Sequence, residues 1–477
     1  MVTLLRSQNR TVKISRDHPH LVICGGGASA VLLVRALQRS GERPLDVTVV
    51  EPRTTAGVGL AYSTPSPSHL LNVPTGRMSA DADDANGFVG WLLANAPETA
   101  WSAKSFAPRH LYGAYLKSLL GSAIVDKHAA VQVRVVRASV DAIARGAQHW
   151  TLTLSDGKAL AADEVVIATG NAPPRPWFSA DAEAGDRILN DPWNGGAKAE
   201  IARDANVALI GSGLTAVDIA VELLDRGHRG QIRMVSRHGL LPRKHAPALV
   251  SAGWLFPPFP RSIAELMHLT REEAHRTPGR DAWRTAIDAL RPQLPAIWGA
   301  LGDDDKARFL RHVRPFWEVH RHRMAPDVAA RIESAMADER IVIQQGRLRA
   351  IEKAKGGAGL NVRLRTQGRE ISIAADVAIN CTGPECDPTA ARNPLIVDLL
   401  RSGFARPDPL HLGIDTDADN RVVAADGRVH ESLYAVGPVA RGRLWEVTAI
   451  PEIRHQTACL SRIISPSASE QAQAYTI

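Results

Sequence analysis

The chain has 477 residues, of which 45% are hydrophobic, and a formal net charge of +7. A chain of this length buries large cores and is expected to form two or three domains. The positive charge would fit a nucleic-acid partner, but Lys and Arg are scattered and only 5% of residues are aromatic. A basic surface or anionic small ligands explain the charge equally well, and we expect no nucleic-acid partner.

The four cysteines form no C-x-x-C pair, which excludes a zinc knuckle and the dithiol of a disulfide reductase. We therefore expect reduced thiols, a cytoplasmic protein and no metal site. No apolar run approaches the length of a membrane span, so no membrane partner is expected.

The first element in chain order is a glycine-rich turn. The apolar run 21–24 is typical of a buried parallel strand, and Gly25, Gly27 and Ala30 then supply G-x-G-x-x-A. The first glycine permits a tight strand-to-helix turn, the second lets backbone approach a pyrophosphate, and Ala30 lets helix pack on strand. The predicted helix 28–40 directs its N-terminal amides at that pyrophosphate.

A second β-rich run, 46–50, ends in Glu51, twenty-six residues after Gly25. A carboxylate at this place accepts the hydroxyls of an adenosine ribose. The spacing predicts a dinucleotide site that suits the adenosine half of FAD. The alternative is a glycine turn with a structural role alone.

The loop 52–79 is too rich in Gly, Pro, Ser and Thr for regular structure. Loops that follow the second strand of such a unit lie across the cofactor crevice. We therefore expect Gly59, Leu71 and Asn72 to contact cofactor, and His69 and Asn72 to be candidate catalytic residues. An ordinary surface loop is the alternative.

Arg109 stands at the start of a predicted amphipathic helix within 106–120 and is a candidate phosphate contact. A solvated surface arginine is the alternative. Alternating runs in 131–167 predict an antiparallel insert that leads back into the main sheet at Thr169 and Gly170, both expected at the cofactor. The proline-rich exit at 173–177 is typical of a domain boundary.

A second unit repeats the first. Strand 207–210 precedes Gly211 and Gly213, and a count of twenty-six residues from Gly211 ends at Arg237. Where the first unit has a carboxylate, the second has Ser236 and Arg237, a hydroxyl and a cation suited to a 2′-phosphate. We therefore expect NADPH rather than NADH here. An arginine that stacks on adenine is the alternative.

The pattern becomes helical over 258–335, which predicts an all-helical insert. Its last helix is rich in Arg and His residues. Two interpretations of this helix remain open: its charged face is solvated, or one face lines an anion pocket. From the insert we select Arg291, Arg314 and His320 as candidate catalytic residues.

Strands return at 341–346, and the segment 376–383, which ends in Gly383, resembles the strand at 163–170. Near the end, a strand, a turn at Gly437 and a helix within 433–464 would direct backbone amides at a flavin, with Glu446 as a further contact. We therefore expect an FAD-binding domain in two parts, 1–190 and 346–477. The NADPH-binding domain is expected at 191–345.

Nearly the whole chain resembles the FAD/NAD(P)-binding proteins with a G-x-G-L-A-Y loop, which are related to flavin N-hydroxylases. The resemblance rests on GVGLAYSTPSPSHLLNVP, FAPRHLYGAYL, VSRHGLLPR, RPFWEVHRHRMAP and YAVGPVARGRLWEVTAIPEIRHQ, in that order. It implies an α/β fold with two Rossmann-like dinucleotide-binding domains, for FAD and NADPH. In one departure, Pro438 follows Gly437 where an Asp often binds the flavin side.

Members of that family with an assigned reaction include enzymes that N-hydroxylate small amino acids, notably aspartate towards nitrosuccinate, with NADPH and O₂. The resemblance thus implies a flavin monooxygenase. Arg291, Arg311, Arg314 and Arg321 would supply the cations that an acidic amino acid needs. His69, His312, His320 or His322 would act as base. An NADPH-dependent flavin reductase and a redox sensor remain alternatives, and a homodimer is considered as the oligomeric state.

Overall fold

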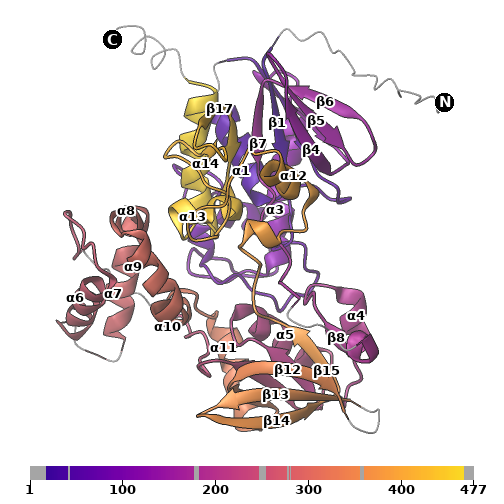
Figure 1. Cartoon of the computed structure of the whole chain (residues 1–477), viewed down its shortest axis with the longest axis vertical. Coiled ribbons are helices and arrows are strands. Elements are labelled where there is room, and N and C mark those ends of the chain that lie inside the picture. The colour runs from indigo at the N-terminus through magenta and orange to yellow at the C-terminus, as the bar shows by residue number, and fades with distance from the viewer. Residues whose placement is uncertain are drawn as a thin grey trace.

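The computed structural model describes residues 18–40, 43–176, 182–246, 254–276, 279, 281–354 and 359–466. Figure 1 shows two sheet-containing parts, one above the other, with a cluster of helices beside them. No helix in the described ranges is long and apolar enough to cross a membrane. Trp177, at the end of the predicted boundary 173–177, lies outside these ranges.

The first sheet has six strands in the order β16-β17-β7-β1-β2-β3. All neighbours pair in parallel except β16 and β17, which pair antiparallel. Helix α1 connects β1 to β2, which confirms the βαβ unit that the first glycine turn predicts. The bounds are β1 His20–Cys24, α1 Ala28–Ser40, β2 Leu45–Val50, β3 Val131–Val136, β7 Glu164–Ile167, β16 Arg421–Val423 and β17 Val429–Ala435.

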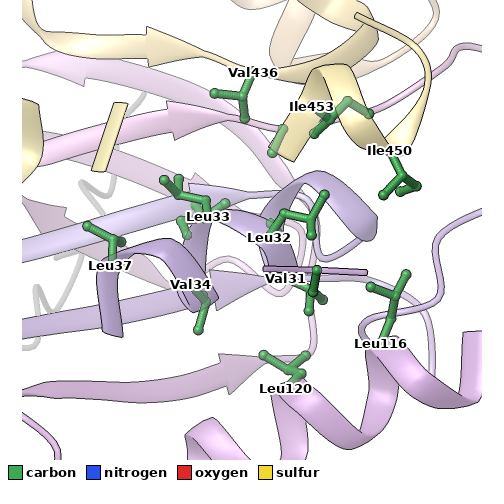
Figure 2. Close-up of a cluster of buried hydrophobic side chains, with 14 of the residues drawn as sticks. Val31, Leu32, Leu33, Val34, Leu37, Leu116, Leu120, Val436, Ile450 and Ile453 are labelled. Atoms are coloured by element: carbon green, nitrogen blue, oxygen red, sulfur yellow. The ribbon is translucent and has the colours of Figure 1, made fainter. Parts of the chain in front are cut away.

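One face of this sheet is covered by α1 together with α3 (Arg109–Val125) and α14 (Ile450–Ile464). Leu32 and Leu33 of α1 lie with Ile453 of the C-terminal helix in one buried hydrophobic cluster (Figure 2). The other face packs on a small antiparallel sheet and α12. These elements are β4 Val140–Arg145, β5 Trp150–Leu154, β6 Ala159–Ala162 and α12 Pro394–Arg401.

The second sheet has five parallel strands in the order β11-β10-β9-β15-β8. A three-stranded antiparallel sheet, β12-β13-β14, packs on one face, and α5 and α11 pack on the other. The bounds are β8 Ile188–Leu189, β9 Val207–Ile210, α5 Leu214–Asp225, β10 Ile232–Ser236, α11 Pro326–Ala337, β11 Ile341–Gln345, β12 Arg347–Lys353, β13 Leu360–Thr366, β14 Arg369–Ala375 and β15 Val377–Asn380.

The expected division of the chain at 345 is wrong. Strand β15 pairs with β9 in the second sheet, not with the first sheet. The sequences of β15 and β7 are similar because the two strands occupy equivalent places in their sheets. Each pairs with the strand that precedes a glycine turn: β7 with β1, and β15 with β9. The second part therefore runs through β15, and β8 shows that it also begins before 190.

The helical insert stands at the side of the molecule in Figure 1. It comprises α6 Ile263–Arg276, α7 Ala282–Leu290, α8 Leu294–Ala300, α9 Asp303–Arg308 and α10 Arg314–Arg321. Trp298 of α8 joins it to the first part: its Nε1 donates to the carbonyl of Gly442 at 2.9 Å and its ring stacks on Trp445. Shorter helical segments are Thr75–Arg77, α2 Gly87–Asn95, Ala182–Arg187, α4 Gly195–Ala199, Arg291–Gln293, Phe309–Val313, Pro388–Ala390, Gly437–Ala440 and α13 Arg441–Leu444.

The packing of α1 predicts a large cost for truncating its core face. Leu33 is fully buried, so Leu33→Ala should lower the free energy of unfolding by roughly 2–5 kcal/mol. The same change at Leu93, which is 52% exposed on α2, should have an effect of less than about 0.5 kcal/mol. Urea denaturation followed by circular dichroism measures both. Equal effects of the two variants would contradict this packing.

Candidate active site

The first glycine turn is held against the end of β7. Gly25 has φ +110°, and a Cβ there would lie 2.4 Å from the carbonyl oxygen of Ala168. Gly27 faces Gly59 of the long loop, whose Cα is 3.4 Å from a Cβ built on Gly27. Backbone therefore lines both sides of this turn, which leaves close access for a pyrophosphate.

Glu51 is fixed at the end of β2. It is buried, and its carboxylate accepts the N–H groups of Gly26 at 2.8 Å and Arg53 at 3.0 Å. A Cβ at Gly26 would lie 2.7 Å from that of Glu51, so the glycine makes room for the acid. A carboxylate has about four acceptor positions, so two remain for ribose hydroxyls.

These residues belong to a first crevice of about 240 Å³. It lies at the carboxyl ends of β1, β2 and β7, where open α/β sheets bind nucleotides. The expected cofactor residues that line it are Gly25, Gly27, Glu51, Gly59, Arg109, Thr169, Gly170 and Gly383. Asn171, Pro438, Thr448 and Ile450 line it as well.

A second crevice, of about 470 Å³, begins at the other glycine turn and includes Gly211, Gly213, Ser236 and Arg237. Gly211 has φ +126°, and a Cβ there would lie 2.3 Å from the carbonyl oxygen of Cys381. This repeats the geometry of the first turn. Arg237 is exposed and has no ion pair in the described part of the chain, so its guanidinium is free for a phosphate.

The two crevices meet. Nine described residues line both: Ala61, Tyr62, Arg109, Asn171, Thr215, Gly383, Pro384, Thr448 and Ile450. They come from the long loop, from the ends of β7 and β15, and from the starts of α3, α5 and α14. The far ends of two dinucleotides, one from each glycine turn, would therefore come together at this junction.

Four ionisable side chains line the second crevice beside the insert. They are Arg314, Glu318, His322 and Arg441. Arg314 is paired with Glu318 at 2.7 Å. Arg441 has no carboxylate partner among the described residues; it lies over the ring of Trp445 at 4.4 Å. His322 lies 4.0 Å from Glu446. Burial lowers the pKa of His322, against the opposing effect of Glu446.

Two histidines selected from the sequence lie away from the crevices. His69 is buried; its ring contacts Thr64 Oγ1 at 2.6 Å and the carbonyl of Asp218 at 3.1 Å, so it ties the long loop to α5. His320 packs on Trp283 and lines a separate cavity inside the insert. Among the histidines considered as base, His322 is the one that lines a crevice in the described chain.

The insert arginines were expected to be free to bind an acidic substrate, and the structure corrects this expectation. Arg291 is paired with Glu452 at 2.8 Å, and Arg321 with Glu446 at 3.0 Å and Glu452 at 3.4 Å. Arg291 and Arg321 line neither crevice. Arg311 is exposed and also lines neither crevice. Carboxylates of the chain therefore neutralise Arg291, Arg314 and Arg321, three of the four cations that were expected to hold an acidic substrate.

Arg109 is also neutralised. It forms an ion pair with Asp218 at 2.7 Å and donates from Nε to the carbonyl of Leu70 at 3.1 Å. Arg109 lines both crevices, but its contacts make it a link between the long loop and α5 and not a free cation. Leu71 and Asn72 line only the second crevice, on the side away from Glu51.

Three further residues that were expected to contact cofactor, Ala30, Gly437 and Glu446, make contacts within the protein instead. Ala30 is buried in the α1 core. Gly437 has φ +75°, and a Cβ there would lie 2.4 Å from Ser29 Oγ, so close packing explains this glycine. Glu446 accepts from Trp317 Nε1 at 2.9 Å and is paired with Arg321, so it does not face either crevice.

The sequence reasoning missed Asn171, Thr448 and Arg441 as crevice residues. Asn171 directly follows Thr169 and Gly170, so extending that turn by one residue would have found it. Thr448 and Arg441 lie in the C-terminal segment that was expected to approach the flavin. No spacing rule singles them out, because the segment bends at Trp445, which has φ +52°.

The second crevice predicts a preference for a 2′-phosphate. Arg237→Ala should weaken NADPH binding at least about tenfold, because it removes a charge-assisted contact. Binding of NADH, which has no 2′-phosphate, should change little. The matched control is Arg229→Ala, since Arg229 is exposed and paired with Asp204 outside both crevices. Calorimetric titration of each nucleotide measures this, and an equal loss for NADPH and NADH would refute the assignment.

Two protein-family models match the sequence. Residues 22–172 match the FAD-NAD(P)-binding family, and residues 101–280 match the family of L-lysine 6-monooxygenase and L-ornithine 5-monooxygenase. No curated protein matches the chain.

Solved structures share its fold at low identity. Ornithine hydroxylase of Pseudomonas aeruginosa is 15% identical, with a TM-score of 0.62 over 93% of this chain and 98% of that one. Ornithine N-hydroxylase of Kutzneria sp. 744 is 15% identical, with 0.62 over 94% and 99%. L-lysine 6-monooxygenase of Pseudomonas syringae is 17% identical, with 0.61 over 94% and 100%.

The expected α/β fold with two dinucleotide-binding domains is confirmed, as are FAD and NADP as the cofactors of this type of protein. The chain is thus similar over residues 22–172 to FAD-NAD(P)-binding proteins and over residues 101–280 to the L-lysine and L-ornithine monooxygenases, and it shares the fold of the solved ornithine and lysine hydroxylases.

Proposed function

We propose that the protein uses NADPH and O₂ to hydroxylate the amine nitrogen of an amino acid, held by its carboxylate at the junction of the two crevices. The observation that carries the proposal is the shared wall of Asn171, Gly383 and Thr448. This wall brings the second dinucleotide to the first, and it leaves space beside them in the larger crevice. One oxygen atom goes to the nitrogen and the other leaves as water, with two electrons from NADPH.

Arg441 is the proposed carboxylate partner. It lines the second crevice without an acidic partner among the described residues. Its Nε donates to the carbonyl of Trp445 at 3.1 Å and its Nη1 contacts Cys386 Sγ at 3.6 Å, which leaves Nη2 and the second hydrogen of Nη1 for one carboxylate. An acidic amino acid such as aspartate needs two cations, and Arg314, the insert arginine that lines the same crevice, is already paired with Glu318. This favours a substrate with one carboxylate over the dicarboxylate expected from the sequence. The relatives named for ornithine and lysine act on such molecules.

His322 is the proposed proton acceptor. Only an unprotonated amine has the lone pair that attacks an electrophilic oxygen, so the substrate ammonium must lose its proton. His322 lines the crevice, and Glu446 at 4.0 Å stabilises its protonated form. Arg441, which lines the same crevice without an acidic partner among the described residues, disfavours the ammonium form of a bound substrate.

FAD fits the first crevice through the glycine turn and Glu51, and when reduced it supplies the activated oxygen. The chain's own contribution is to hold and orient the substrate and to limit water. Tyr62 at the shared wall is only partly exposed, and Ile450 and Leu71 are buried. Such apolar walls protect reactive oxygen species from proton leakage.

The test is product analysis after incubation with NADPH and air. Ornithine, lysine, alanine, aspartate and cadaverine are compared by mass spectrometry for hydroxylamine formed per NADPH consumed. We expect coupled product from an amino acid with one carboxylate and little from cadaverine, which has none. Arg441→Ala should raise KM for that amino acid at least about tenfold. Arg443→Ala, the exposed neighbour outside the crevice, should not.

Coupled product from cadaverine or aspartate alone would contradict the role of Arg441 and leave N-hydroxylation standing. Hydrogen peroxide without any hydroxylamine would favour an NADPH-dependent flavin oxidoreductase that passes electrons to a partner or quinone. Absence of NADPH oxidation would favour a redox sensor.

The position of His322 predicts a pH dependence. Because its pKa is lowered, the neutral, proton-accepting form should persist below the ordinary pKa of about 6.5. The rate of hydroxylamine formation should then fall as the pH falls through this lowered pKa. His322→Gln should lower the rate and remove this acidic limb, while FAD reduction by NADPH keeps its rate. An unchanged acidic limb in the variant would exclude His322 as the base.

A further inference from the structure

The helical insert contains a cavity of its own, of about 470 Å³. This lies within the range of roughly 300–1,000 Å³ that is typical of small-molecule sites. Its walls come from α6, α7, α8, α10 and the segment Phe309–Val313, together with Trp445, and they are mostly aliphatic and aromatic. Examples are Leu266, Ile287, Leu290, Trp298, Phe309 and Trp317.

The cavity is separate from both nucleotide crevices, because it has no lining residue in common with either. Helix α10 stands between them: Phe316 and Trp317 line the cavity, while Arg314 and Glu318 of the same helix line the second crevice. A ligand inside the insert is therefore neither FAD, NADPH nor the amine substrate at the junction.

The ionisable groups at the cavity are all basic. Arg271, His312 and His320 line it, and no Asp or Glu does among the described residues. Arg271, at the exposed surface of α6, has no ion pair in the described chain. An ammonium head group would find no counter-charge here, whereas a carboxylate would find one free guanidinium.

The neighbourhood of His320 adds to this positive character. Arg284 and Arg323 lie over the Trp283 ring at 4.4 and 5.0 Å, although each is also paired with an aspartate. Burial and these arginines lower the pKa of His320. The histidine is therefore a neutral hydrogen-bonding group, and Arg271 remains the free cation in the described lining.

We propose that this cavity binds an amphiphilic monocarboxylate, with its alkyl or aryl chain among the tryptophan and leucine side chains and its carboxylate at Arg271. The apolar walls account for the chain, since burial of apolar area drives binding. The single free cation accounts for one negative charge. This site is additional to the proposed N-hydroxylation, and its test does not depend on that activity.

The experiment uses the FAD-loaded full chain and decanoate as the probe, kept below its micelle concentration. Decylamine and decanol carry the same chain with a positive or neutral head. Calorimetry gives affinity and stoichiometry, and tryptophan fluorescence reports the site because Trp283, Trp298 and Trp317 line it. We expect saturable binding of one decanoate, weaker binding of decanol and no binding of decylamine. Equal or tighter binding of decylamine or decanol would overturn the proposal.

Variants locate the binding. Arg271→Gln should weaken decanoate binding about fivefold or more and leave decanol unchanged, because only the head-group contact is lost. Ala274→Phe should abolish binding of both by filling the cavity that Ala274 lines. The control is Arg276→Gln, which removes the same charge from the same helix at a residue outside the cavity. If Arg271→Gln has no effect, or no more than Arg276→Gln, the assignment of the carboxylate to Arg271 is wrong.

Discussion

The absence of a side chain at two glycines is the constraint on which the rest of the structure depends. At Gly25 and Gly211 a Cβ would lie 2.4 and 2.3 Å from a carbonyl oxygen of the neighbouring strand's end. Each sheet can therefore bring a strand end, a helix start and the next strand together around open backbone amides. Because the two turns are built alike, the protein has two nucleotide crevices, and their shared wall defines where chemistry can occur.

The helical insert completes that region through buried charges. Arg321 and Glu446 are both nearly inaccessible to solvent and lie 3.0 Å apart, with Glu452 beside them. Removing one partner would leave an uncompensated buried charge. This network joins α10 to the Trp445 segment and to α14, and so it positions His322 and Arg441 at the second crevice. Two of the arginines expected to hold substrate, Arg291 and Arg321, instead hold the insert in place.

Local patterns predicted much of this from the sequence. The glycines of the two motifs, Glu51 and Arg237 depend on short-range spacing, and the structure places Gly25, Gly27, Gly211, Gly213, Glu51 and Arg237 in the crevices. The assignment of β15 failed because equivalent strands of the two sheets have similar sequences, and sequence does not state which sheet a strand joins. The pairing of Arg291 with Glu452 joins residues far apart in the chain, and no periodicity reveals such a contact.

The central claim is that the two crevices bring NADPH to FAD at the wall around Asn171, Gly383 and Thr448. Anaerobic mixing of the FAD-loaded protein with NADPH, followed by stopped-flow absorbance, tests it most directly. The account predicts complete loss of the oxidised-flavin absorbance at a rate that saturates with NADPH concentration. A flavin that remains oxidised while NADPH is bound would contradict it, because the two nucleotides would then occupy separate and unconnected sites.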